Sequence, residues 1–173
     1  MSMLFGANKQ VIPFWNGILV GCTTEEQVIK LIGEGYVSIK DGTKGRSYVN
    51  RNHNLTICIR FDAKDTVTTI EFVNGNMFKD KDEEFLKKIS LQNIGDSISI
   101  GRNITFHFKM KPRELISQLG EPDDIHIYPE SVQAGYRYFD DFYLEVISGA
   151  EFLYFNNILK KVTIINRIVY RDY

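Results

Sequence analysis

The sequence predicts an α+β protein of two similar repeats, each a short helix followed by an antiparallel β-meander. An amphipathic segment that ends in Gly-Glu occurs twice, at 23–35 and at 111–122. The two glycines, Gly33 and Gly120, are 87 residues apart, which is about half of the 173-residue chain. Strand-like, aromatic-rich sequence follows each segment, and both halves finish in a stretch that contains Val-Thr. Because these matches occur in the same order, together they indicate an internal duplication.

The first repeat is expected to begin with a helix. Thr23 or Thr24 supplies a hydroxyl that can cap the helix N-terminus, and Gly33 can end the helix. Apolar residues recur at helical spacing and predict one buried face, formed by Val28, Leu31 and Ile32. Alternating β-branched and aromatic residues around polar turns then predict two hairpins, 36–40 with 46–50 and 55–61 with 67–72.

A middle helix is expected at 80–88, with a buried side made of Phe85, Leu86 and Ile89. The second repeat then follows, with its helix at 111–119, where Pro112 suits the first turn. Its strands are expected at 98–100, 104–108, 135–139, 142–147, 151–155 and 159–165. This reading divides the chain into a first repeat (1–78), a bridging helix (79–95) and a second repeat (96–173).

Composition narrows the class of protein. Hydrophobic residues make up 43% and charged residues 25% of the chain, and the formal net charge is −1. Such a balance gives no global attraction to nucleic acid or to an acidic membrane surface. The N-terminal residues lack the pattern of a signal peptide, and no apolar run reaches the roughly 18 residues that span a bilayer. The sequence therefore predicts a cytoplasmic protein without nucleic-acid or membrane partners.

Charge is distributed unevenly along the chain. The segment 121–151 contains eight acidic residues and a single basic one, Arg137, for a net charge of −7. Tyrosines and phenylalanines interleave with these acids, and such a surface suits a basic protein partner, because charge steers the encounter and rigid aromatics supply buried contacts. The acids also fit the solvent side of strands whose aromatics fill a core. The candidate partner-binding residues are Asp123, Asp124, Tyr136, Tyr138, Asp140, Asp141 and Tyr143.

The other chemistry-bearing residues form weaker patterns. Asp123 and Asp124 precede His126, a spacing compatible with a divalent metal or an enzyme site, but also with a solvated loop. His53 lies in a polar turn, and His107 lies between two phenylalanines on an expected strand. The two cysteines match no metal spacing and are too few for a secreted disulfide scaffold. No catalytic residue, metal or cofactor is expected.

One resemblance rests on the pattern of a polar cap, a short helix, Leu-Gly-x-Pro and then several strands. In the second half it is carried by Leu115, Leu119, Gly120, Glu121 and Pro122, followed by Tyr136 and Tyr138 on a strand. In the first half it is carried by Val28, Ile32, Gly33 and Glu34, with Gly35 in place of the proline. The pattern resembles the repeat of the BamE/SmpA outer-membrane lipoproteins and of the beta-lactamase-inhibitor-protein-like folds, and it implies a binding protein of the kind common among bacterial immunity proteins.

These observations lead to a functional hypothesis. The chain is expected to be a noncatalytic binding or inhibitor protein, a bacterial immunity protein that neutralises a basic toxin by occlusion through its second half. Homodimerisation through edge strands is a further expectation for so strand-rich a chain. Two alternatives stay open at this point: an envelope-assembly or structural module, and an enzyme with a site around Asp123, Asp124 and His126.

Overall fold

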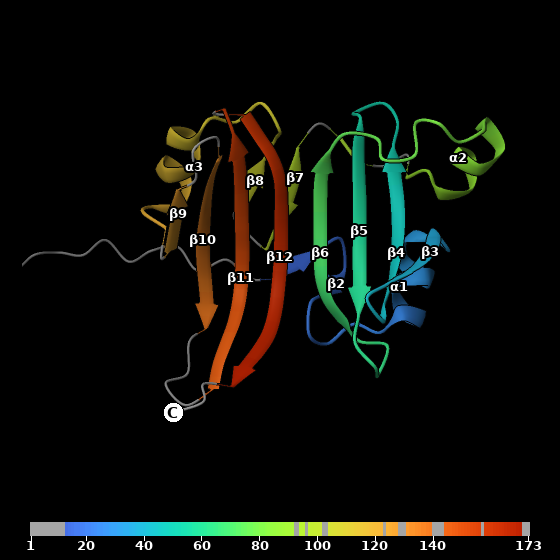
Figure 1. Ribbon diagram of the computed structural model, residues 1–173, viewed down its shortest axis with the longest axis horizontal. Helices are drawn as coiled ribbons and strands as arrows, with labels where there is room; N and C mark the ends of the chain where they lie inside the picture. Colours follow the sequence, from blue (N-terminus) through green and yellow to red (C-terminus); the bar gives the residue numbers. More distant parts are fainter. Residues whose placement is uncertain are drawn as a thin grey trace, which may run out of the picture.

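The computed structural model describes residues 13–91, 94–95, 97–101, 104–122, 124–127, 131–139, 144–156 and 158–170. Its main element is an antiparallel sheet of eight strands in the order β3-β4-β5-β6-β12-β11-β10-β9 (Figure 1). Two small two-stranded sheets and three helices complete the described elements. The predicted α+β class, with antiparallel strands, is confirmed.

The first half of the sheet consists of β3 (Tyr36–Lys40), β4 (Thr43–Asn50), β5 (Leu55–Phe61) and β6 (Val67–Asn74), each paired with the next. Both predicted hairpins are present. The first has a tighter turn than expected, because Asp41 and Gly42 both adopt positive φ, 51° and 75°. This pair of conformations makes a two-residue hairpin loop, so that β4 begins at Thr43 rather than Arg46.

The second half consists of β9 (Asp124–Ile127), β10 (Ser131–Phe139), β11 (Leu144–Phe155) and β12 (Ile158–Tyr170). The strands expected at 142–147 and 151–155 form one strand, since Ser148, Gly149 and Ala150 stay paired with β12 instead of turning. Strand β9 was not among the predicted strands. The halves join where β12 pairs with β6, with Ile164 opposite Ile70.

A second layer covers one face of the sheet. It contains α1 (Glu25–Ile32), α3 (Pro112–Leu119), the pair β1 (Phe14–Trp15) and β2 (Ile18–Leu19), and the pair β7 (Ile98–Ile100) and β8 (Ile104–Phe106). Residues from all of these elements share one buried cluster with alternate residues of β5, β6, β11 and β12. The same core therefore spans both halves of the sheet.

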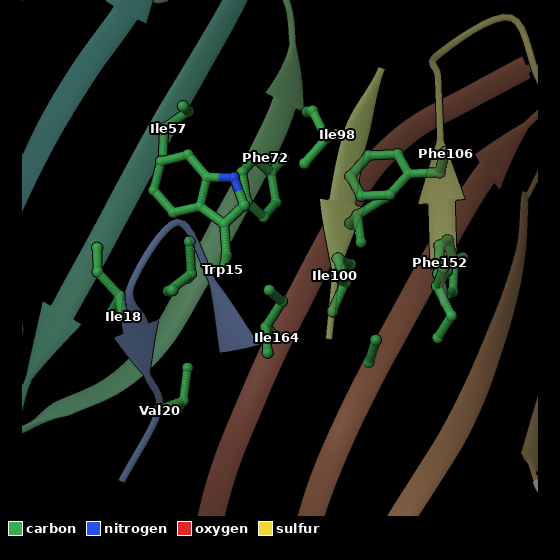
Figure 2. Close-up of a cluster of buried hydrophobic side chains, with 14 of the residues drawn as sticks. Trp15, Ile18, Val20, Ile57, Phe72, Ile98, Ile100, Phe106, Phe152 and Ile164 are labelled. Carbon is green, nitrogen blue, oxygen red and sulfur yellow. The ribbon is translucent and has the colours of Figure 1, made fainter. Parts of the chain in front are cut away.

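Aromatic rings connect the two layers through the centre of the core. Trp15 meets Phe72 edge to face, with 5.1 Å between ring centroids, and Phe72 meets Phe106 at 5.7 Å (Figure 2). Phe106 in turn meets Phe152 at 6.0 Å. Edge-to-face pairs at these separations are favourable beyond their buried area. The chain of contacts runs from β6 in the first half to β11 in the second.

Helix α2 (Glu83–Ile89) packs on the other face of the sheet. Its Leu86 and Ile89 form a small cluster with Val49, whose neighbour on β4, Tyr48, belongs to the main core. Successive residues of a strand point to opposite faces, so α2 lies opposite the second layer. The predicted middle helix is thus confirmed, and Asp82 caps it through a 2.8 Å hydrogen bond from the amide of Phe85.

Both α1 and α3 end at the predicted glycines. Gly33 has φ 90° and ψ −179°, and Gly120 has φ 83° and ψ −170°, a region essentially restricted to glycine. The predicted buried face of α1 was partly wrong: Val28 is fully buried, but Leu31 is 50% exposed. A Cβ on Gly35 would lie 2.6 Å from the Tyr48 ring, which explains glycine at this position in the first half.

Candidate functional site

Three of the predicted partner-binding residues lie at one end of the main sheet. Asp124 lies on the edge strand β9, paired with Gly135, and Tyr136 lies on the neighbouring β10, paired with Ala150. Tyr138 lies at an irregularity of the β10–β11 register. The remaining four candidates, Asp123, Asp140, Asp141 and Tyr143, lie outside the described residues.

The acidic segment 121–151 contributes three adjacent strands: β9, β10 and the first eight residues of β11, Leu144 to Glu151. Of the eight acidic residues of this segment, Asp124, Glu145 and Glu151 lie on these strands, together with its basic residue, Arg137, for a net charge of −2. At the other end, the segment 36–74 that forms β3 to β6 carries six basic and four acidic residues, a net charge of +2. The described charges therefore differ in sign between the two ends of the sheet, and such a difference favours a directional field around a protein of small net charge.

Polar side chains also form a row across the face of the sheet opposite the second layer. Directly paired residues share a face, and the pairing places Ser47, Cys58, Glu71, Thr163 and Glu151 in one row over five strands. Glu71 lies 3.5 Å from the Lys161 ammonium and 3.7 Å from the Arg60 guanidinium. These contacts link the first half of the sheet to β12.

Cys58 contributes a free thiol to this row. Burial raises the pKa of the thiol and outweighs the opposing hydrogen bond from the Ser47 hydroxyl, at 3.5 Å from Sγ. The thiol therefore stays protonated at neutral pH, which disfavours nucleophilic chemistry.

An ion network attaches α1 to the first half of the sheet. Arg46 donates to Glu25 at 2.7 Å and lies 3.2 Å from the Glu34 carboxylate, while Lys44 bonds both Glu25 and Asp65. The Glu25 side chain is only 12% exposed. Burial acts to raise the pKa of Glu25, but the hydrogen bonds from Lys44 and Arg46 outweigh it and hold the pKa below its ordinary value. Every charge here has a partner, which is the arrangement of a structural network.

A cleft of about 380 Å³ opens where β5 begins and β6 ends. His53 comes from the β4–β5 turn, Asn74 from the end of β6, and His107 and Lys109 from the turn between β8 and α3. Residues at the start of β7 complete the wall. The fold therefore brings together two histidines that are 54 positions apart in the sequence.

The prediction that His107 lies on a strand was wrong. Strand β8 ends at Phe106, so His107 lies in the following turn, where its carbonyl accepts a 2.9 Å hydrogen bond from the amide of Met110. That turn reverses the chain into α3 and directs His107 to the cleft. Only the Lys-Met-Lys-Pro sequence before the helix marks this turn, since proline disfavours the helical conformation in the residue before it.

His126, the centre of the alternative site, lies on β9, paired with Gln133. Asp123 lies outside the described residues. Within the described part of the chain, no group of three or more His, Cys, Asp or Glu side chains is arranged to hold a metal ion. No helix among those described is long and apolar enough to cross a membrane.

Comparison with known proteins gives one structural relative. No protein-family model and no curated protein sequence matches this chain. The crystal structure of a DUF4309 family protein, YjgB from Bacillus subtilis, is similar to it with a TM-score of 0.53 over 87% of this chain and 83% of that one. The two sequences are 12% identical, so the likeness concerns the fold alone.

Proposed function

We propose that this protein is a noncatalytic binding protein, of the immunity or inhibitor type, that covers a basic surface of a protein partner. The observation that supports this proposal most directly is that three adjacent strands, β9 to β11, come from the acidic segment 121–151. Asp124, Glu145 and Glu151 lie on these strands, and acidic residues there would attract a basic partner, while the net positive charge of β3 to β6 would orient the approach.

Aromatic residues make the same end suitable for affinity as well as steering. Tyr136 and Tyr138 lie on β10, between the acidic strands β9 and β11. Tyrosine buries a large area at small entropic cost and keeps a hydroxyl for hydrogen bonding, so it is common among the residues that dominate binding energy. Occlusion requires no catalytic group: a toxin whose active site binds a polyanion is blocked when an acidic surface covers it.

We also propose that the fold arose by duplication of one helix-and-meander unit. The spacing of 87 residues relates three equivalent pairs: Val28 with Leu115, both buried, Ile32 with Leu119, and Gly33 with Gly120. It also relates the third helical residues, Gln27 and Glu114, whose side chains accept hydrogen bonds from the amides of Thr24 and Lys111 at 2.9 and 2.6 Å. In each half the helix precedes four antiparallel strands, and the last strands, β6 and β12, pair with each other.

The binding proposal is tested by capture from the native host. The C-terminally tagged protein is expected to co-purify with a stoichiometric basic partner, and the double reversal Asp140→Lys with Asp141→Lys is expected to weaken that complex at least about tenfold. Most of the effect should be slower association, largest at low salt, because salt screens the steering field.

The matched control is Asp80→Lys with Glu84→Lys. It makes the same change in net charge at exposed positions in and just before α2, on the first half of the molecule. The control is expected to bind as tightly as the unmodified protein. Equal weakening by both double variants would show that net charge alone matters, and no weakening by Asp140→Lys with Asp141→Lys would rule out the acidic end as the binding surface.

A further inference from the structure

The cleft beside the β5–β6 hairpin contains groups that the proposed partner-binding surface does not use. Its volume of about 380 Å³ falls within the range of roughly 300–1,000 Å³ in which small molecules bind proteins. The described lining contains His53, His107 and Lys109. Amide and hydroxyl groups are supplied by Asn74 and Ser97.

Three apolar residues, Leu55, Ile98 and Phe108, also line the cleft. Leu55 is 2% exposed and Ile98 is 3% exposed, and both belong to the main core cluster, against which Phe108 also packs. The lining therefore combines hydrocarbon and an aromatic ring with nitrogen donors. Apolar side chains with a few polar groups are the usual composition of a specific small-molecule site.

Backbone and side-chain hydrogen bonds fix the walls. The amide of Leu91 donates to the carbonyl of Val49 at 2.8 Å, and the side-chain amide of Asn50 donates to the carbonyl of Ile94, so that the segment before β7 is tied to β4. Asn74 donates through Nδ2 to the carbonyl of Leu159 at 3.4 Å. A site held in this way needs little reorganisation to bind, which favours affinity.

We propose that this cleft binds a small organic anion, a phosphate or carboxylate attached to an apolar or aromatic body. The Lys109 ammonium and the imidazole of His107 supply N–H donors. Leu55, Ile98 and Phe108 receive the body of the ligand. This inference does not depend on the partner-binding proposal, because the cleft and the acidic strands β9 to β11 share no described residue.

The test is a titration of the full-length, isotope-labelled protein with phenyl phosphate, benzoate and phenol, followed by amide NMR shifts. Phenyl phosphate or benzoate is expected to shift the resonances of residues that line the cleft, and the neutral phenol is expected to bind at least about tenfold more weakly, because it lacks charge-assisted hydrogen bonds. Saturation by phenyl phosphate but not by benzoate would show that the cleft binds phosphates. Saturation by benzoate but not by phenyl phosphate would show that it binds carboxylates. Binding of phenol as tight as that of both anions, or shifts outside the cleft alone, would overturn the proposal.

Variants separate charge recognition from general packing. Lys109→Ala and His107→Ala are each expected to weaken phenyl phosphate or benzoate, whichever binds, about tenfold. The control is Lys64→Ala, which removes one exposed lysine from the loop at the other end of the same hairpin and is expected to change nothing. If His107→Ala does not fold, the affinity of Lys109→Ala tests the proposal by itself, because Lys109 is exposed and its replacement should not disturb folding. Unchanged affinity in Lys109→Ala would overturn the assignment.

Discussion

Helices α1 and α3 occupy corresponding places in the two halves of the molecule but are attached to the sheet by different forces. Both have eight residues, precede four strands and end at a glycine whose amide bonds the carbonyl four residues earlier, at 2.8 and 2.7 Å. Helix α3 buries two leucines, Leu115 and Leu119, each 1% exposed. Helix α1 buries Val28 and adds the ion network around Glu25.

This difference shows that two helices can occupy corresponding positions in a fold although different interactions hold them against the sheet. Apolar burial stabilises α3 in a way that depends little on pH. The Glu25–Arg46 network must first overcome the desolvation of its charges, so it stabilises α1 only while both partners stay ionised. Variants at these two attachments test the comparison.

The largest effect is expected at Leu115. Leu115→Ala should lower the free energy of unfolding by roughly 3 kcal/mol, because it removes buried methyl groups and leaves a cavity under α3. The corresponding change in α1, Val28→Ala, removes less hydrocarbon and should cost roughly 2 kcal/mol. Urea unfolding measures both. A cost at Val28 equal to or above that at Leu115 would contradict the view that α1 depends less on apolar burial.

A smaller, pH-dependent effect is expected at Glu25. Glu25→Gln should cost about 2 kcal/mol at pH 7, since it leaves Arg46, itself 9% exposed, with only the more distant and solvent-exposed carboxylate of Glu34 as a charge partner. Because the folded state lowers the pKa of Glu25, the stabilisation is complete above the ordinary glutamate value of about 4.5 and is lost as the pH falls through the lower folded value.

The measurement is urea unfolding at pH 7 and at steps down to pH 3. The unmodified protein should lose more stability than Glu25→Gln below about pH 4.5, so that the two curves converge. The control is Glu26→Gln at the neighbouring position. Both side chains of the Glu26–Lys30 ion pair are exposed, so its loss should lower the free energy of unfolding far less. Parallel curves for the unmodified protein and Glu25→Gln would show that the network is not linked to folding.

Much of the fold could be predicted because local signals were strong. The caps and glycine stops marked α1 and α3, and the alternation in 55–61 and 67–72 marked β5 and β6. Strand β9 was missed because Asp-Ile-His-Ile is short and charged, and its pairing with β10 is a tertiary contact that local propensity does not report. The small residues at 148–150 suggested a break in β11, yet partners on both sides keep that strand continuous.

Of the two candidate sites, one could be predicted from the sequence and the other could not. The acidic segment was visible in the sequence because its residues are contiguous, and the position of Asp124, Tyr136 and Tyr138 on adjacent strands follows from the antiparallel pairing of β9 with β10. The cleft between His53 and His107 was not visible. Its two histidines come from turns that meet only after the small β7–β8 sheet has packed on the large one, so no spacing along the chain reports it.

The smallest effect is expected at the N-termini of the two helices, where the halves differ by one side chain. In α1 the hydroxyl of Thr24 accepts from the amide of Gln27, whereas Lys111 at the corresponding place in α3 has no side-chain cap and puts a positive charge at the positive end of the helix. Lys111→Thr should therefore stabilise the protein by about 0.5–1 kcal/mol, and Thr24→Ala should destabilise it by about 1 kcal/mol.

Urea unfolding of the two variants tests these predicted changes in stability. The control is Lys109→Thr, which removes a nearby exposed lysine outside the helix. A gain for Lys111→Thr alone would mean that α3 accepts the cap of α1, because Glu114 already supplies the reciprocal bond to the amide of residue 111. No gain would mean that a hydroxyl at residue 111 does not cap α3, although both N-cap residues have the same extended φ and ψ. The correspondence between the halves would then hold for the helix ends at Gly33 and Gly120 and for the buried faces, but not for the helix starts.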